Sequence, residues 1–260
     1  DNMRILITND DGFDAAGIKS LKKIALDMST EENIFVVAPK VNQSAKSRSV
    51  SYKTAFNIIR KNSNEYSVEG TPTDCIIFAL DHIMKNKKPD IILSGINWGY
   101  NLSEDIFYSG TVAAAAEGAY RGIPSIALSQ AYQEPMEELN PYLFAESCGS
   151  KLCLSLYENF SVALEKTALN VNFPATPLVK YPNCIKITKV GKRERSNFGI
   201  NIVSKSQNLY TATIDSISTN RSSTSNDDYV NCLNGYITIS PVSMCIKKEK
   251  SVEDLRKVKF

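Results

Sequence analysis

Two adjacent carboxylic acids, Asp10 and Asp11, follow a short apolar run near the start of the chain, in the segment Asn9-Asp10-Asp11-Gly12. Like charges this close repel each other, so the pair is costly unless a positive charge lies beside it. A hard divalent cation such as Mg²⁺ takes oxygen ligands, commonly one or two carboxylates, and keeps positions open for water or phosphate oxygens. The pair therefore predicts a metal site, with an ordinary Asp-Gly turn as the alternative interpretation.

Two further polar segments offer neutral ligand atoms for such a site. Ser44 comes soon after the apolar run 34–38 and can add a hydroxyl oxygen to the same ion. Residues 94–101 place paired glycines and paired asparagines after another apolar run. Glycine lets the backbone approach a ligand, and an amide offers both an oxygen and a nitrogen. We expect Asn97 to bind the metal through its side-chain oxygen and Asn101 to donate from its side-chain nitrogen to a phosphate.

A phosphate site is predicted at Ser109-Gly110-Thr111, directly before an alanine-rich run that is typical of a helix. The N-terminus of a helix offers free N–H groups and the favourable end of the helix dipole to an anion. The two hydroxyls add donors, and Gly110 permits close approach. A simple Ser/Thr N-cap is the alternative interpretation.

Together these segments predict a phosphatase. A bound metal ion would hold a phosphate oxygen and lower the pKa of a nearby water, and Asp10 or Asp11 would orient that water or accept its proton. Asn101, the hydroxyls of Ser109 and Thr111, and the helix N-terminus would stabilise charge on the transferring phosphoryl group. The predicted catalytic set is Asp10, Asp11, Asn101 and Ser109.

Two other classes of protein stay open on the same residues. A phosphatase of the aspartyl-phosphate type attacks phosphorus with a carboxylate, although such enzymes usually present Asp-x-Asp, and here the acids are adjacent. A non-catalytic nucleotide-binding module can share the fold, but it has no need for two acids that face an anion. The single histidine, His82, lies on a predicted helix, so Ser-His-Asp hydrolysis is not favoured.

The elements that must position these residues alternate between strand-like and helix-like patterns. Continuous apolar runs predict buried parallel strands at 4–8, 34–38, 90–94, 125–129 and 168–172. Helices are predicted over 18–25, 71–84, 110–120 and 141–160, and the second has Thr71 as N-cap and Pro72 at its first position. This alternation predicts an α/β fold with a doubly wound, mostly parallel sheet and ligands beyond the carboxyl ends of its strands.

The pattern changes near residue 175. Alternating residues predict strands at 185–188, 209–214 and 236–240, and the polar segment Ser216 to Asp228 predicts a long loop. We therefore predict a catalytic core over residues 1–175. Residues 176–260 are predicted to form a β-rich oligomerisation region and a C-terminal extension packed on the core.

Composition excludes several classes of partner. Among 260 residues, 30 basic and 28 acidic side chains give a net charge of +2, too balanced for the basic surface that a nucleic acid polymer requires. No apolar stretch reaches the roughly 20 residues that span a bilayer, so no membrane partner is expected. The six cysteines form no C-x-x-C pair, which favours reduced thiols in a cytoplasmic protein.

The polar segments, in this combination and order, resemble the SurE (survival protein E) family. The resemblance is dense over residues 3–130 and thinner to about residue 245. It is carried by Asn9-Asp10-Asp11-Gly12, Ser44, Gly70 to Cys75, Ser94 to Asn101, Tyr108 to Ala114 and Gly235 to Pro241. Two positions differ from the family pattern: many members carry a histidine near Ser243, and a smaller residue is commoner at Trp98.

The resemblance implies a Rossmann-like core and a metal-dependent 5′/3′-nucleotidase that releases phosphate from nucleoside monophosphates, sometimes with activity on short polyphosphate. It implies a homodimer or homotetramer whose subunits exchange a β-hairpin and the C-terminal extension. By motif, it implies one Mg²⁺ or Mn²⁺ per subunit, bound by Asp10, Asp11, Ser44 and Asn97. The residues implied to contact phosphate are Asn101, Ser109, Gly110 and Thr111.

Overall fold

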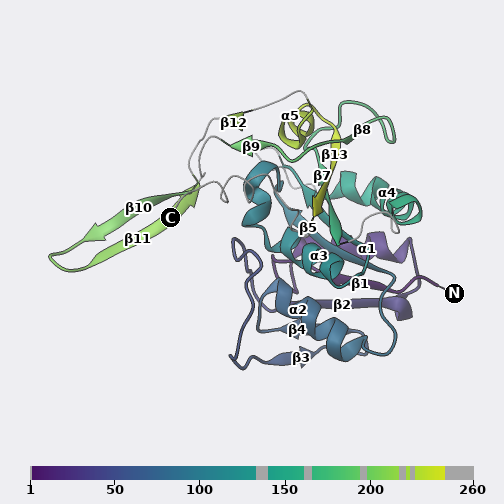
Figure 1. Cartoon of the computed structure of the whole chain (residues 1–260), viewed down its shortest axis with the longest axis horizontal. Helices are drawn as coiled ribbons and strands as arrows, with labels where there is room; N and C mark the ends of the chain where they lie inside the picture. Colours follow the sequence, from purple (N-terminus) through teal and green to yellow (C-terminus); the bar gives the residue numbers. More distant parts are fainter. Residues whose placement is uncertain are drawn as a thin grey trace, which may run out of the picture.

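The computed structural model describes residues 2–132, 140–160, 166–193, 198–216, 221–222 and 226–243. Strands and helices alternate along most of this part of the chain, and the helices pack on both faces of a central sheet (Figure 1). The fold is therefore the predicted α/β, Rossmann-like, doubly wound arrangement.

The central sheet has nine strands in the order β3-β4-β2-β1-β5-β6-β7-β13-β8. Their bounds are Ile58–Arg60 (β3), Glu65–Val68 (β4), Ile34–Pro39 (β2), Ile5–Thr8 (β1), Ile91–Trp98 (β5), Ser125–Gln130 (β6), Thr167–Phe173 (β7), Ile237–Ser243 (β13) and Ile185–Ile187 (β8). Neighbours from β4 to β7 run parallel, whereas β3 and β13 run antiparallel to β4 and β7. The strand order reverses between β1 and β5, and such a switch point opens a crevice beyond the carboxyl ends of the strands.

Four helices cover the two faces of the sheet: α1 (Ala16–Leu26) and α4 (Leu143–Phe160) on one, α2 (Pro72–Phe78) and α3 (Gly110–Tyr120) on the other. Side chains of β1 alternate between these layers. Ile5 and Ile7 join the cluster that includes α1 and α4, and Leu6 joins the cluster with α2 and α3. Because helices cover both faces of the sheet, the sequences of the inner strands are continuous apolar runs.

The helices that border the crevice begin at the predicted caps. Thr71 accepts the N–H of Asp74, and the Asp74 side chain accepts the N–H of Thr71, which completes a capping box with Pro72 in the first turn. The side chain of Ser109 accepts the N–H of Val112 at the start of α3. These caps fix where each helix starts relative to the strand ends.

Several boundaries differ from the predicted ones. The strand predicted to end at Ser94 continues as β5 to Trp98, with a register shift against β6 between Ser94 and Asn97. The paired β3 and β4 at the sheet edge were not predicted, because both are short and β3 is exposed. The helix predicted to reach Met84 is α-helical to Phe78 and then a π-helical turn over Ala79–Ile83.

The long loop predicted over Ser216 to Asp228 is wrong in part. Arg221–Ser222 forms a short strand, β12, that pairs with β9 (Lys192–Arg193), and α5 (Asp228–Leu233) begins at the last residue of the predicted loop. Asp228 accepts backbone N–H groups of Ser103 and Gly191, so this end of the segment is held against the core. Residues 217–220 and 223–225 lie outside the described part of the chain.

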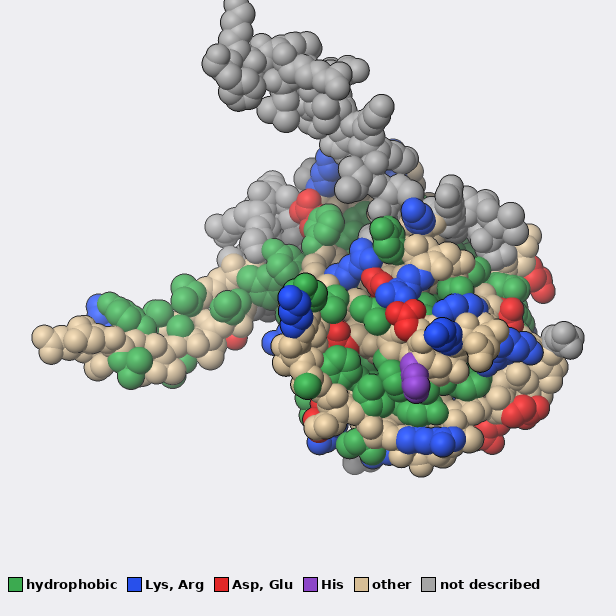
Figure 2. All heavy atoms as spheres, turned by 60° about the horizontal axis from the view of Figure 1, so that its bottom comes forward, with side chains coloured by type: hydrophobic (Ala, Val, Ile, Leu, Met, Phe, Trp, Pro, Cys, Tyr) green, Lys and Arg blue, Asp and Glu red, His purple; other side chains and the backbone are tan. Residues whose placement is uncertain are grey.

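The C-terminal region divides between the central sheet and a projection. Strands β8 and β13 extend the sheet beyond β7. Strands β10 (Phe198–Lys205) and β11 (Tyr210–Ser216) form a hairpin that extends away from the core (Figure 1). Apolar side chains are exposed along this projection (Figure 2), among them Ile200, Ile202 and Ile214. The division at residue 175 and its oligomerisation role stay predictions.

Candidate functional site

The first strand ends in a turn that its own asparagine closes. The side chain of Asn9 is buried; its Nδ2 donates to the carbonyl of Gly12 over 2.8 Å, and its Oδ1 accepts the N–H of Gly12 over 3.3 Å. Gly12 has a φ of +115°, which few other residues adopt. The turn therefore has a fixed shape, and it places Asp10 and Asp11 at the carboxyl end of β1.

Asp10 is buried against the N-terminus of α3. Its Oδ1 accepts the hydroxyl of Thr111 over 2.5 Å, and its carboxylate also accepts the backbone N–H groups of Gly110 and Thr111. A side chain at Gly110 would place its Cβ 2.8 Å from the Cβ of Asp10, so only glycine fits there. Burial raises the pKa of Asp10, and these hydrogen bonds oppose that rise.

Asp11 is half-buried and accepts the backbone N–H of Trp98 over 3.2 Å. Burial, and then the neighbouring charge of Asp10, raise the pKa of Asp11 to about 6. None of the ion pairs among the described residues includes either acid. The two carboxylates therefore form a concentrated negative site of the kind that a divalent cation stabilises.

Asn97 and Ser44 are the sequence neighbours of Trp98 and Gln43, whose backbone N–H groups bond to Asp11 and Asp10. The Nδ2 of Asn97 donates to the carbonyl of Gly99 over 2.9 Å, which leaves its Oδ1 as the atom suited to a cation. Ser44 is exposed, and the N–H of its neighbour Gln43 donates to the carbonyl of Asp10 over 2.7 Å. The loop that carries Ser44 is thus tied to the backbone beneath the acids.

The donor set fits a hard divalent cation. The described residues contain no cluster of three or more His, Cys, Asp and Glu that could hold a metal. A site here would combine the two carboxylates with the neutral oxygens of Ser44 and Asn97, a set of the kind that Mg²⁺ or Mn²⁺ accepts.

Asn101 is the centre of a buried amide network that joins β5 to the ends of β6 and β7. Its Nδ2 donates to the hydroxyl of Ser129 over 2.8 Å, and its backbone N–H donates to the Oδ1 of Asn172 over 2.8 Å. Its carbonyl accepts the side-chain N–H groups of Asn170 and Asn172. These contacts fix Asn101 firmly, and the second hydrogen on Nδ2 is the one suited to a ligand.

Aromatic side chains lie near Asp11 and next to Ser109. The ring of Trp98 is exposed and lies 5.5 Å from that of Tyr132 and 6.4 Å from that of Tyr142, measured between centroids. Burial, and then the charge of Asp11, raise the pKa of Tyr142 well above its usual value. Tyr108, next to Ser109, meets Phe198 at the base of the hairpin, with ring centroids 4.8 Å apart.

A family model described as "Survival protein SurE" matches residues 5–197 of this chain. The chain belongs to the SurE family. A relative from Wolbachia pipientis subsp. Culex pipiens, named "5′-nucleotidase SurE", is 48% identical over 181 residues, which cover 68% of this chain and 67% of the relative. A relative of the same name from Ehrlichia ruminantium is 40% identical over 245 residues, covering 92% of this chain and 93% of the relative.

A solved SurE structure has the same fold. The crystal structure of the SurE protein from Aquifex aeolicus matches with a TM-score of 0.78 at 31% identity, and the match covers 98% of this chain and 100% of that chain. In this SurE chain, no described helix has the length and hydropathy needed to cross a bilayer.

The structure brings most of the predicted residues of this SurE chain together. Hydrogen bonds link Asp10 to Gly110 and Thr111, and Asp11 to the segment that holds Asn97. One predicted donor is engaged elsewhere: the Thr111 hydroxyl donates to Asp10, so a phosphate at this position would meet other donors. The hydroxyl of Ser109 accepts an N–H and keeps its own hydrogen to donate.

Sequence reasoning missed Tyr142, Ser129, Asn170 and Asn172. The three polar residues lie on strands read only as apolar runs, and Tyr142 lies at the start of a helix 131 residues after Asp11 along the chain. Polar residues inside otherwise apolar strand patterns were the one available signal, because a buried amide needs partners.

Proposed function

We propose that this SurE chain is a divalent-metal-dependent phosphatase that hydrolyses nucleoside 5′-monophosphates, and also 3′-monophosphates, to nucleoside and phosphate. Short polyphosphate is proposed as a further substrate. The observation that carries the proposal is the carboxylate pair at the switch point of the sheet, in which buried Asp10 is bonded to the N-terminus of α3 and half-buried Asp11 is bonded to Trp98. The relatives named 5′-nucleotidase support nucleotides as the substrate class.

Asp10, Asp11, Asn97 and Ser44 would hold one Mg²⁺ or Mn²⁺ per subunit. When bound, such an ion supplies Lewis acidity toward a phosphate oxygen and lowers the pKa of water. Asp11 is the more exposed of the two acids, which supports it as the residue that would orient the attacking water. Asp10 is hydrogen-bonded to Thr111 in the first turn of α3. Its proposed role is therefore to bind the ion and to fix the position of the helix relative to it.

The phosphoryl group would lie beside Asp11 and Ser109, because Asp10 already packs against Gly110 and Thr111 at the start of α3. The Ser109 hydroxyl, which accepts the N–H of Val112, and the Nδ2 of Asn101, which donates one hydrogen to Ser129, would each donate a further hydrogen to the phosphoryl oxygens, and the N-terminus of α3 would add a positive dipole end. Such donors act most strongly on the charge that develops in the transition state. Catalysis then depends on donors that the fold holds in place before the substrate arrives.

We also propose that the hairpin β10–β11 contacts a second copy of the chain in a homodimer or homotetramer. Its exposed isoleucines support an apolar partner surface, and its base meets Tyr108 beside the site. The cytoplasm is the proposed compartment, because the described cysteines are all free and buried.

The deciding experiment measures phosphate release from a panel of nucleoside 5′- and 3′-monophosphates, short polyphosphate and p-nitrophenyl phosphate, with Mg²⁺, Mn²⁺ or EDTA. We expect turnover that needs the metal and favours nucleotides over the generic ester. Turnover that EDTA leaves unchanged would contradict the metal site. A trapped phosphoenzyme would indicate the aspartyl-phosphate mechanism, and nucleotide binding without turnover under any ion would indicate a binding module.

A further inference from the structure

The segment between β2 and β3 carries Ser44 and contains neither helix nor strand over residues 41–57. Three of its residues, Ala45, Ser47 and Lys53, have positive φ angles of 60°, 52° and 55°. Residues other than glycine, asparagine and aspartate rarely adopt this conformation, and it persists only where surrounding contacts impose it. The segment next to Ser44 therefore needs anchors.

Side chains of the segment supply anchors at both ends of the strained stretch. Ser47 donates its N–H to the carbonyl of Tyr108 over 3.1 Å and its hydroxyl to the carbonyl of Phe107 over 2.6 Å. Ser51 donates its hydroxyl to Oδ2 of Asp74 over 2.7 Å, in the capping box of α2. The segment thus joins the starts of α2 and α3.

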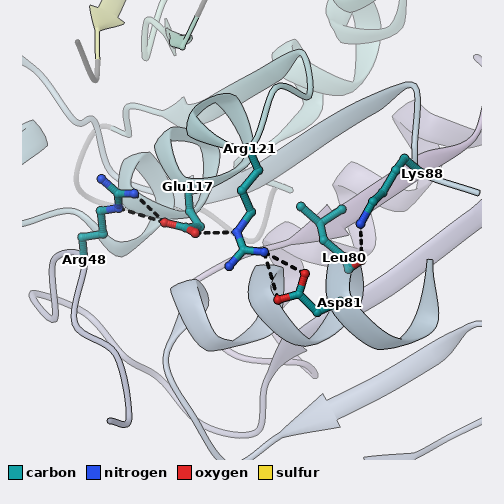
Figure 3. Close-up of polar contacts among 6 residues, drawn as sticks. All are labelled: Arg48, Leu80, Asp81, Lys88, Glu117 and Arg121. Carbon is teal, nitrogen blue, oxygen red and sulfur yellow. Dashed lines mark hydrogen bonds and ion pairs between the residues drawn. The ribbon is translucent and has the colours of Figure 1, made fainter. Parts of the chain in front are cut away.

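An ionic anchor lies between these hydrogen bonds. Arg48 donates from Nε over 3.1 Å and from Nη2 over 2.5 Å to Oε2 of Glu117 on α3 (Figure 3). The Glu117 side chain is only 9% exposed, and its other oxygen accepts Nε of Arg121 over 2.7 Å. Arg121 in turn pairs with Asp81 over 2.9 Å. Arg48 is the member of this network that comes from the Ser44 segment.

We propose that Arg48 is a positioning residue: its pairing with Glu117 holds the strained 41–51 segment against α3, so that Ser44 stays beside Asp10 and Asp11. This inference rests on the proposed metal site. Helix α3 binds Arg48 through Glu117 and binds Asp10 through Thr111 in its first turn. The same helix therefore fixes the positions of both the Ser44 segment and Asp10. A guanidinium suits this role because its planar fork fixes direction as well as distance.

The test compares Arg48→Ala with Arg121→Ala. Each substitution removes one guanidinium from Glu117, but only the first releases the Ser44 segment. Mn²⁺ affinity is measured by electron paramagnetic resonance on the full chain, together with thermal melting and hydrogen exchange at Gln43 and Ser47. For Arg48→Ala we expect about tenfold weaker Mn²⁺ binding, as residues that support metal ligands typically show, and faster exchange at both amides. Arg121→Ala should keep the wild-type affinity, and Arg48→Lys should restore part of it.

The outcomes separate this inference from the proposed function. Wild-type protein that binds no Mn²⁺ overturns the metal site itself and this inference with it. Wild-type binding with unchanged affinity and exchange in Arg48→Ala overturns the positioning role alone. An equal loss in Arg48→Ala and Arg121→Ala also overturns it, because the effect would then come from Glu117 rather than from the segment.

Discussion

The strand-end site and the hairpin β10–β11 depart from ordinary burial in opposite directions. At the site, Asp10 is 3% exposed and Thr111 is fully buried, although both are polar. On the hairpin, Ile200 is 71% exposed and Ile214 is 73% exposed, although both are apolar, and they face each other across the two strands.

Each departure indicates a missing partner of a different kind. An acidic pair without an ion pair suits the proposed divalent cation, which is small and charged. An exposed apolar face calls for another protein surface. The two regions also meet: Tyr108, beside the turn proposed to bind phosphate, contacts Phe198 at the base of the hairpin. Substitutions at the site and on the hairpin can test the two proposed partners separately.

The largest effect is expected from Asp11→Asn, which removes the charge while keeping the shape of the side chain. We expect a loss of turnover of about a thousandfold, equivalent to about 4 kcal/mol in the barrier, because the metal and the attacking water lose a charged ligand. Steady-state kinetics at saturating Mn²⁺ measure it. Asp14→Asn, three residues on and exposed, is the matched control and should keep near-normal rates. Similar rates in both variants would contradict the assigned role of Asp11.

The second-largest effect is expected from charges placed on the apolar face of the hairpin, away from the site. Ile200→Lys combined with Ile214→Lys places two charges on its apolar face, and burying them in an interface would cost several kcal/mol. We expect the dissociation constant of the proposed oligomer to rise by about a hundredfold or more, measured by analytical ultracentrifugation. Asn201→Lys with Thr213→Lys adds the same charges to the opposite face and should leave assembly intact. Equal dissociation in both pairs, or none in either, would refute an apolar interface on this face.

The smallest effect is expected at Trp98, an exposed aromatic beside Asp11. The Trp98 ring is apolar and exposed, like the isoleucines of the hairpin. Its position beside Asp11, however, indicates a nucleobase as its partner. Stacking on an aromatic ring is worth about 1–3 kcal/mol per base, so Trp98→Ala should raise KM for nucleoside monophosphates by about tenfold. KM for p-nitrophenyl phosphate, which has no base, serves as the internal control. An equal rise for both substrates would indicate a general change in the pocket instead of base stacking.

The local patterns of the sequence predicted much of the fold. Helix α3 begins at Gly110 and ends at Tyr120 as expected, because a Ser N-cap precedes a run of strong helix formers. The parallel strands β1, β2, β5, β6 and β7 followed from continuous apolar runs. The edge strand β3 did not, because Ile58-Ile59-Arg60 is too short to show a period.

The sequence alone determined which polar residues follow the apolar runs, namely two acids and two asparagines, and which turn, Ser-Gly-Thr, precedes the alanine-rich helix. The tertiary structure decided what each of them touches. Thr111 donates to Asp10 across 101 residues of sequence, Asn101 reaches Ser129 and Asn172, and Arg48 pairs with Glu117. Local propensities act over a few residues, whereas these pairs exist only because the parallel sheet brings distant strand ends to one edge.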